Sequence, residues 1–326
     1  MSCQAQDRTD KKIRISQNST EIATPNTQEK DSSSNMYADA PSVITRNILQ
    51  DKNGVIWFAT FEGIISYDGA SFSNLTKGQP IRFFSVLEDR HGHLWFGSIG
   101  YGVYRYDGSA LKSYTTQDGL VDDRVTDIYE DEMGKLWFAT TGGISVYDSN
   151  SFTNFTMDDG LLDNDVNSII QDKSGLYWIG TRGKAFTYDG YIFAEITNNE
   201  GDSFYNVRDI AMDSRGHIWM GGNDGLWRYD GEHYIRITPD FTGYIYEDIV
   251  GNIWTSSVNS TLQGWTLNQY DSISINNLRP MSTQVLTDEG MFFGILEDTD
   301  HNIWVGKLDG VYRLSEEGDV QDFKAQ

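Results

Sequence analysis

The sequence predicts an all-β protein, and more specifically a seven-bladed β-propeller of four-stranded antiparallel blades. Three observations lead to this prediction: a tryptophan-centred motif that recurs along the chain, strand-like segments separated by tight turns, and a composition rich in glycine and aromatic residues. The 326 residues include 32 Gly, only 5 Pro and 13% aromatic side chains. Such a composition supplies many turns and a sizeable apolar core, as an all-β repeat protein requires.

The recurring motif reads Asp-x-x-Gly-x-(Ile/Leu)-Trp, with small variations. Its seven copies end at Trp57, Trp95, Trp137, Trp178, Trp219, Trp254 and Trp304. The intervals between these tryptophans are 38, 42, 41, 41, 35 and 50 residues. Six residues before each tryptophan stands an aspartate: Asp51, Asp89, Asp131, Asp172, Asp213, Asp248 and Asp298. Self-similarity with a period near 40 residues indicates a repeat architecture.

The third repeat shows how one unit divides into four strands. Residues 125–130 alternate between apolar and polar side chains, and further strand-like segments follow at 135–140, 144–147 and 152–155. The first turn runs from Asp131 to Gly134, where glycine supplies the positive φ of a tight hairpin. In four other repeats the last turn reads Tyr-Asp-Gly, which is a strong hairpin signal. Large apolar residues on both strand faces predict blades that are covered by a neighbour on each side.

The chain is expected to divide into two regions, a tether at residues 1–40 and the propeller at residues 41–326. The first region is rich in small polar and charged residues and poor in large apolar ones, which predicts disorder. Near its start lies Cys3, the single cysteine of the chain. A small residue before a cysteine, followed by a polar tether, resembles the cleavage site of a bacterial lipoprotein. We therefore expect lipidation at Cys3, and the alternative is an unmodified thiol in a flexible tail.

Charge and composition exclude several classes of function. The formal net charge is −23 and the isoelectric point is near 4.4. A chain this acidic repels nucleic acid phosphates and anionic lipid head groups, so neither is an expected partner, and contact with a membrane is expected only through the lipid anchor. One cysteine excludes an intrachain disulfide and a multi-cysteine zinc site. No metal site and no cofactor are predicted, and no apolar stretch is long enough to span a bilayer.

The consensus of the repeats resembles a known family. It reads Val-x-x-Ile-x-x-Asp-x-x-Gly-x-Ile-Trp-Phe-Gly-Thr-x-x-Gly-(Ile/Val)-x-x-Tyr-Asp-Gly-x-x-Phe, and this is similar to the two-component regulator propeller repeat. The segments 118–121 and 159–162 resemble the inter-blade linker of that family. The resemblance implies the periplasmic sensing module of bacterial signalling proteins, some of which respond to products of polysaccharide breakdown. It is expected here as a stand-alone propeller without kinase or response regulator.

The motif's aspartates are expected to be architectural. The Asp-x-x-Gly turn resembles the Asp-box of sialidase-type propellers, where it has a structural role. Folding can require the same aspartate in every blade, whereas a catalytic site does not need one copy per blade. His91, His93, His217 and His301 fall in or beside this turn, and His233 is expected at the outer rim. Histidine-based catalysis at the channel mouth is therefore disfavoured.

Ligand binding is expected on the opposite face, at the mouth of the central channel. The candidate ligand-binding residues lie before the first strands or in the second-to-third loops: Arg46, Arg82, Tyr101, Arg124, Arg182, Lys184, Arg208, Asn223 and Lys307. Phe61 lies in one of the same loops. Arginine binds carboxylate or sulfate in a bidentate manner, and an aromatic ring can stack on a sugar. The alternative is that these cations form structural ion pairs with Asp122, Asp123, Asp127, Asp165 and Asp209.

These patterns favour a non-catalytic propeller that binds an oligosaccharide or another small ligand. We expect it in the periplasm or at the cell surface, lipid-anchored to the outer membrane. Two alternatives stay open: a polysaccharide lyase or hydrolase on the same scaffold, and a scaffold for a protein partner. The sixth repeat is irregular over residues 255–291, which indicates either an insertion that carries specificity or a drifted blade.

Overall fold

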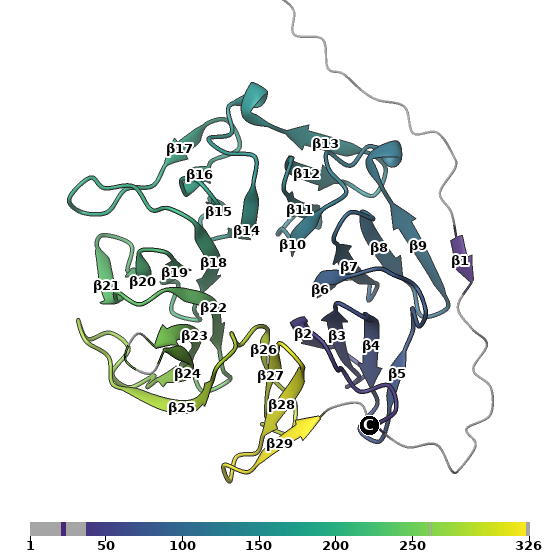
Figure 1. Ribbon diagram of the computed structural model, residues 1–326. Coiled ribbons are helices and arrows are strands. Elements are labelled where there is room, and N and C mark those ends of the chain that lie inside the picture. Colours follow the sequence, from purple (N-terminus) through teal and green to yellow (C-terminus); the bar gives the residue numbers. More distant parts are fainter. Residues whose placement is uncertain (1–20, 24–36, 260, 262, 324–326) are drawn as a thin grey trace, which may run out of the picture.

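Seven antiparallel sheets stand in a ring around a central axis in the computed structural model (Figure 1). The structure describes residues 21–23, 37–259, 261 and 263–323. Each sheet takes four strands that follow one another in the chain, and the first of the four lies nearest the axis. The predicted seven-bladed propeller with four-stranded blades is therefore confirmed.

The two inner strands of each blade form a hairpin closed by the Asp-x-x-Gly turn. The first strands are β2 (Thr45–Gln50), β6 (Phe83–Glu88), β10 (Val125–Glu130), β14 (Val166–Gln171), β18 (Val207–Met212), β22 (Thr242–Glu247) and β26 (Ile295–Glu297). The second strands, which carry the repeat tryptophans, are β3 (Ile56–Thr60), β7 (Leu94–Ser98), β11 (Leu136–Thr140), β15 (Tyr177–Thr181), β19 (Ile218–Gly222), β23 (Ile253–Asn259) and β27 (Ile303–Lys307).

The two outer strands complete each blade toward the rim. The third strands are β4 (Gly63–Tyr67), β8 (Val103–Tyr106), β12 (Gly143–Tyr147), β16 (Phe186–Tyr188), β20 (Gly225–Tyr229), β24 (Gly264–Tyr270) and β28 (Gly310–Leu314). The fourth strands are β5 (Phe72–Asn74), β9 (Ala110–Tyr114), β13 (Phe152–Phe155), β17 (Phe193–Glu195), β21 (Tyr234–Thr238), β25 (Ser282–Asp288) and β29 (Val320–Phe323). Short 3₁₀ helices η1 (Thr116–Asp118) and η2 (Met157–Asp159) follow two of these strands, and no helix in the described residues has the length and apolar character needed to cross a membrane.

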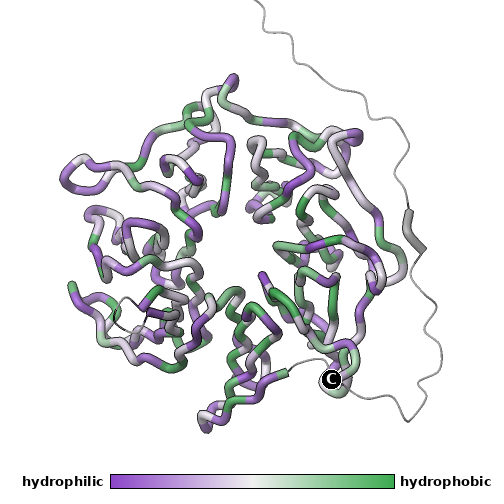
Figure 2. Tube along the Cα trace, viewed as in Figure 1, coloured by the Kyte–Doolittle hydropathy of each residue, from purple (hydrophilic) through white to green (hydrophobic). Residues whose placement is uncertain are grey.

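The apolar core lies between neighbouring blades. In three blades the phenylalanine that follows the repeat tryptophan packs against the tryptophan of the preceding blade: the ring centroids are 6.0 Å apart for Phe96 and Trp57, and 5.8 Å apart for Phe138 and Trp95. The same contact closes the ring, because Phe58 of the first blade lies 5.7 Å from Trp304 of the last. Figure 2 shows the corresponding pattern, with hydrophobic segments inside the blades and hydrophilic ones at many outer turns.

Every Asp-x-x-Gly turn is held by the same contacts. In all seven, the aspartate Oδ2 accepts a hydrogen bond from the indole Nε1 of the repeat tryptophan, at 2.6–3.0 Å. The Oδ1 accepts the backbone N–H four residues further along, again in all seven. A carboxylate that satisfies both a backbone donor and a buried indole fixes the hairpin and the core residue together. This is the architectural role that the sequence predicted.

The described residues of the segment 1–40 contact the propeller. Strand β1 (Glu21–Ala23) pairs antiparallel with β9 and adds a fifth strand to the second blade. Tyr37 packs on Phe323 of the last strand, with 5.9 Å between ring centroids, and Ala40 is buried. Packing against the propeller therefore begins before the expected boundary at residue 41. The predicted lipidation site, Cys3, lies outside the described residues.

Candidate functional site at the channel mouth

The two faces of the propeller carry different kinds of residue. The Asp-x-x-Gly turns join the first strand to the second on one face, and the second-to-third loops and the links into the next blade lie on the other. All five histidines lie on the face of the Asp-x-x-Gly turns. His93 and His217 contact Asp89 and Asp213 through Nδ1 at 3.0 and 2.9 Å. His301 contacts Glu297 at 2.7 Å, and this hydrogen bond raises the pKa of its imidazole.

A β-bulge at the start of six first strands sets the lining of the channel. In each of these blades the register between the first and second strands shifts by one residue. The extra residues are Arg46, Phe84, Thr126, Asn167, Arg208 and Gly243. All six line the same cavity of about 190 Å³ around the axis. A bulge re-aims a side chain without ending the strand, so one position per blade is free to vary.

Arg46 lies between two aromatic rings in this cavity. Its guanidinium carbon is 3.9 Å from the ring centroid of Phe84 and 4.5 Å from that of Phe293. Its Nε is buried and has no hydrogen-bond partner within the described residues. Burial, and second the positive charge of Arg208, lower the pKa of Arg46 to about 9. The side chain is thus a charged, rigidly stacked donor whose hydrogen-bonding capacity is only partly used.

Two carboxylates at the channel accept hydrogen bonds from backbone N–H groups. Asp127 accepts the N–H of Ile128 at 2.9 Å and that of Ile169, in the next blade, at 3.0 Å. Asp209 accepts the N–H of Ile245, also in the next blade, at 2.6 Å. Burial raises the pKa of Asp127 to about 7 and that of Asp209 to about 6. Both carboxyls therefore titrate near neutral pH while they join adjacent blades.

Arg208 also lines the channel cavity, and the side-chain amide of Asn167 orients it. Its Nη1 donates to the Oδ1 of Asn167 at 3.1 Å, and the Nδ2 of Asn167 donates to the carbonyl of Val207 at 2.9 Å. Burial, and second the charge of Arg182, lower the pKa of Arg208. The asparagine thus holds a cation in the channel without neutralising it.

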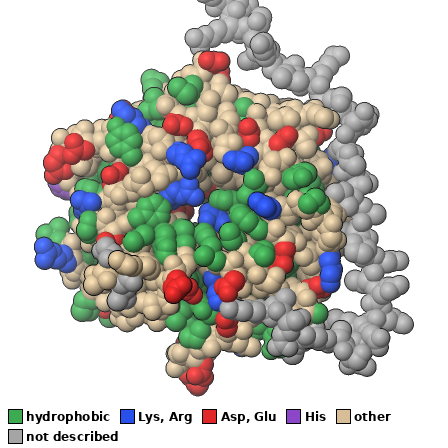
Figure 3. Space-filling view, in the orientation of Figure 1, with side chains coloured by type: hydrophobic (Ala, Val, Ile, Leu, Met, Phe, Trp, Pro, Cys, Tyr) green, Lys and Arg blue, Asp and Glu red, His purple; other side chains and the backbone are tan. Residues whose placement is uncertain are grey.

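The other residues expected at the rim divide into two groups. Arg82, Tyr101, Arg124, Arg182 and Asn223 are exposed on this face. The backbone brings two of them together, because the N–H of Ile99 donates to the carbonyl of Arg82 at 2.9 Å and Ile99 forms a β-bridge with Arg124. Figure 3 shows Lys and Arg side chains gathered around the centre of the face in view, beside hydrophobic ones.

Lys184 and Lys307 do not contribute to the rim. Lys184 forms an ion pair at 2.7 Å with Glu195 of the outer strand β17. Lys307 is buried, pairs with Asp322 of β29 at 3.3 Å and Asp309 at 3.1 Å, and lies 3.9 Å from the ring centroid of Tyr312. Both lysine side chains point toward the outer strands, where they pair with acidic residues. Their position in the second-to-third loops did not predict these ion pairs.

The expected ion pairs of the rim form in one case only. Arg182 contacts Asp165 at 3.4 Å. Asp122 instead accepts the N–H of Arg124 at 2.7 Å, and Asp123 accepts the N–H of Thr116, also at 2.7 Å. Of the arginines expected at this rim, Arg46, Arg82, Arg124 and Arg208 make no ion pair with a carboxylate of the described residues. A chain with a large negative charge thus presents unpaired guanidinium groups at its channel.

Several channel residues were not identified from the sequence as ligand-binding candidates. Phe84, Asn167, Tyr244 and Phe293 all lie in or against the channel cavity. A usable signal existed for the first two, since each occupies the position equivalent to Arg46 and Arg208 in its own repeat. No group of three or more His, Cys, Asp or Glu side chains suited to a metal ion occurs among the described residues.

The fold and this channel define a seven-bladed propeller with a cationic, aromatic-lined mouth. Four segments, at residues 40–62, 119–142, 160–183 and 201–224, match the family model described as "Two component regulator propeller". Each segment covers the link into a blade and the first two strands of that blade. These four segments are therefore similar to two-component regulator propeller repeats, the resemblance that the consensus motif predicted.

Solved structures share the fold. One is the extracellular domain of a protein described as the hybrid two-component system BT3049 from B. thetaiotaomicron, with a TM-score of 0.73 and 22% identity over 88% of this chain. A second, the extracellular domain of BT4673 from the same organism, gives a TM-score of 0.66 and 22% identity over 85% of this chain. This chain spans only 40% and 39% of the lengths of those two chains.

The fold also occurs in enzymes. The virginiamycin B lyase of Staphylococcus aureus matches 91% of this chain and 98% of its own length, with a TM-score of 0.63 and 15% identity. No curated protein sequence matches the chain at a significant level. At these identities the likenesses establish the architecture alone.

Proposed function

We propose that this protein is a non-catalytic binding module that recognises an acidic oligosaccharide at the mouth of its propeller channel. One observation carries the proposal: four arginines face or surround the channel without a carboxylate partner within the described residues, although the chain as a whole is strongly acidic. Guanidinium groups bind carboxylate and sulfate with paired, charge-assisted hydrogen bonds. Phe84, which lines the channel cavity, and the exposed ring of Tyr101 supply apolar surface on which sugar rings can pack.

The comparisons support a sensing role. The two B. thetaiotaomicron proteins are described as a hybrid two-component system and a one-component system, and the structures are their extracellular domains. By that analogy we propose that this protein lies outside the cytoplasm and passes its ligand-bound state to a protein partner. The lipid anchor on Cys3 is proposed from the sequence around that cysteine alone. Mass spectrometry of the protein isolated from its native membrane tests the anchor, because an acylated cysteine adds a defined mass to the N-terminal peptide.

Calorimetric titration with trigalacturonate and with neutral maltotriose tests the proposed ligand class. We expect the acidic trisaccharide to bind and the neutral one to bind much more weakly. Arg124→Gln and Arg208→Gln should each weaken binding about tenfold, since a hydrogen bond to a charged group contributes about 1.5–3 kcal/mol. Lys52→Gln, on the opposite face and paired with Glu88, is the matched control that should leave the affinity unchanged.

The pH dependence gives an independent readout. An anion bound beside Asp127 and Asp209 favours their protonated forms, so binding takes up protons. Affinity for trigalacturonate should therefore increase as pH falls through about 7 and 6, the pKa values of the two carboxyls. An affinity for trigalacturonate that changes neither with the arginine substitutions nor with pH would contradict the channel site. Release of shorter fragments with new reducing or unsaturated ends would identify an enzyme instead.

A further inference from the structure

The junction between the fifth and sixth blades departs from the other junctions. In six repeats the residue after the motif tryptophan is large and apolar: Phe58, Phe96, Phe138, Ile179, Met220 and Val305. All six are buried between their own blade and the preceding one. In the sixth repeat this residue is Thr255, and the cross-strand partner of Thr255 is Asn268. Ser257 and its partner Thr266 continue the same face toward the end of β23, so this part of the side that faces blade five is polar. Nearer the Asp-x-x-Gly turn the same side stays apolar, because Ile253 and Tyr270 pack with Trp219 of blade five.

The sixth blade is also longer than the others. Strands β23, β24 and β25 have seven residues each, whereas the second strands of the other blades have five. Residues 271–281 connect β24 to β25, where other blades have a short Tyr-Asp-Gly type of turn. This connection carries Leu278 and Arg279, both exposed. The added length projects one wall outward beside β21 of the fifth blade.

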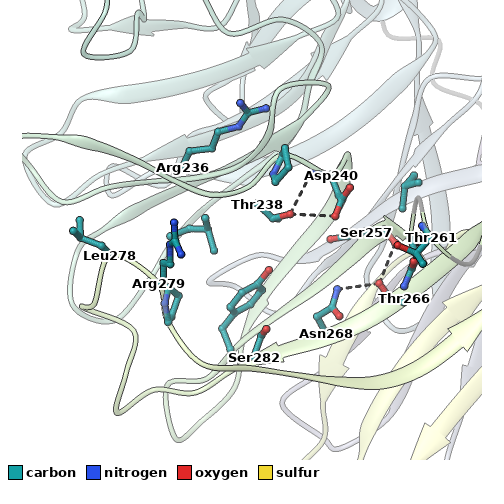
Figure 4. A pocket seen from close by; sticks show the side chains of 16 residues that line it. Arg236, Thr238, Asp240, Ser257, Thr261, Thr266, Asn268, Leu278, Arg279 and Ser282 are labelled. Atoms are coloured by element: carbon teal, nitrogen blue, oxygen red, sulfur yellow. Dashed lines mark hydrogen bonds between the residues drawn. The ribbon is translucent and has the colours of Figure 1, made fainter.

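A groove of about 720 Å³ results between the two blades. Its lining comes from the end of β21 and the residues after it, from β23 and β24, and from residues 278–282 (Figure 4). The volume falls within the range of about 300–1,000 Å³ that is usual for small-molecule sites. It is several times larger than the channel cavity of about 190 Å³.

Two cations, one carboxylate and several neutral polar groups line this groove. The carboxylate is Asp240, whose Oδ2 accepts a hydrogen bond from the hydroxyl of Thr238 at 3.3 Å. In the view of Figure 4, Arg236 and Arg279 lie toward one end, and Thr261, Thr266 and Asn268 toward the other. Neither arginine makes an ion pair within the described residues, and the guanidinium of Arg236 lies 5.6 Å from the ring centroid of Trp227.

The polar end of the groove keeps hydrogen-bonding capacity for a ligand. Asn268 donates through Nδ2 to Thr266 at 3.0 Å, and its Oδ1 accepts no hydrogen bond from the described residues. The hydroxyls of Ser257 and Thr266 are buried and already form hydrogen bonds within the sixth blade. The exposed Ser282 adds a hydroxyl to the lining. Such groups match the hydroxyls of a sugar ring.

We propose that this groove is a second binding site, separate from the channel, for a saccharide that carries a carboxylate. The carboxylate of the ligand lies between Arg236 and Arg279, and its ring hydroxyls contact the Oδ1 of Asn268. Two guanidinium groups at one end select an anion, and the hydroxyl and amide wall at the other end selects a polyhydroxylated ligand over a simple carboxylic acid. The proposal extends the proposed function and does not depend on it, because the two sites share no residue.

Hydrogen–deuterium exchange of the whole chain with trigalacturonate locates the site. We expect the peptides that contain 236–240 and 264–270 to gain protection. The double variant Arg236→Gln/Arg279→Gln should lose that protection, and both side chains are exposed, so the fold should not suffer. Lys52→Gln is again the control for loss of a surface charge.

A filling substitution provides a second test. Asn268→Leu restores the apolar character that Ile65 and Phe186 give to the equivalent position in other blades. It should abolish protection of the groove peptides while leaving the thermal midpoint equal or higher. Protection that persists in the double variant, equal protection by maltotriose, or no protection of the groove by trigalacturonate would overturn the proposal. Loss of channel binding alone, through Arg124→Gln, would leave the groove peptides protected.

Discussion

Seven aspartates on one face of the propeller make the same contacts in every blade, whereas the bulge residues around the channel differ from blade to blade. Each aspartate binds its indole and the same backbone N–H. The bulge positions hold two arginines, a phenylalanine, a threonine, an asparagine and a glycine. Folding needs identical hairpins, so one face is uniform. Recognition needs a particular arrangement of charges, so it uses positions that the strand pairing leaves free.

The junctions between blades show the same contrast on a smaller scale. Most are filled by an apolar residue that packs on a tryptophan, such as Phe96 on Trp57. The fifth-to-sixth junction has the buried Thr255 in place of that residue, and the large groove lies beside it, lined by Ser257 and Asn268 of the same face. Departure from the repeat therefore marks both surfaces that we propose to bind ligands.

The largest effect is expected on the uniform face. Asp131→Ala removes the acceptor of the Trp137 indole, of the Lys135 N–H and of the Tyr177 hydroxyl. Because hydrogen bonds to a charged group contribute about 1.5–3 kcal/mol each, we expect a loss of about 3–5 kcal/mol in unfolding free energy. Urea denaturation measures it. Asp148→Ala, in an exposed turn of the same repeat, is the control, and an equal loss in both variants would contradict a special role for the motif aspartate.

A smaller effect isolates the contact between two blades. The hydroxyl of Tyr177 donates to Asp131 of the preceding blade at 2.9 Å, and burial followed by this hydrogen bond raises the pKa of the tyrosine. Tyr177→Phe should cost about 1–2 kcal/mol in unfolding free energy and leave ligand affinity unchanged. In the Asp131→Ala background the same substitution should cost almost nothing. Additive losses in the double variant would show that the two groups act independently.

A third effect belongs to the channel face and appears as a pH dependence of stability. Burial raises the pKa of Asp127 to about 7, above its ordinary value of 3.8. A raised carboxyl pKa favours the folded state at low pH, so this contribution is full below about pH 4 and is lost as pH rises through 7. Asp127→Asn removes the titration and should flatten the decline in thermal midpoint over that interval. An unchanged slope would show that Asp209 or another group controls it.

The repeat made most of the fold predictable. The motif fixed the number of blades, the strands of each blade and the turn with its tryptophan, because every blade must satisfy the same hairpin and the same core contact. The positions of cationic side chains in the tertiary structure were harder to predict from the sequence. Arg46 and Arg208 were identified and do line the channel, but Lys184 and Lys307 face acidic residues of outer strands that lie 11 and 15 residues away in sequence. Loop membership does not reveal which partner a long side chain reaches.

The sequence by itself determined the architecture of this protein, because a short-range pattern repeated seven times leaves one economical way to bury both faces of each sheet. Only the tertiary structure decided where recognition is possible. It showed that Asp127 and Asp209 accept backbone N–H groups while four arginines of the rim have no carboxylate partner among the described residues, and that polar residues of the sixth blade line a groove beside the fifth blade. Both results depend on contacts between residues of different blades. The amino-acid sequence alone does not specify these contacts, because the residues lie far apart along the chain.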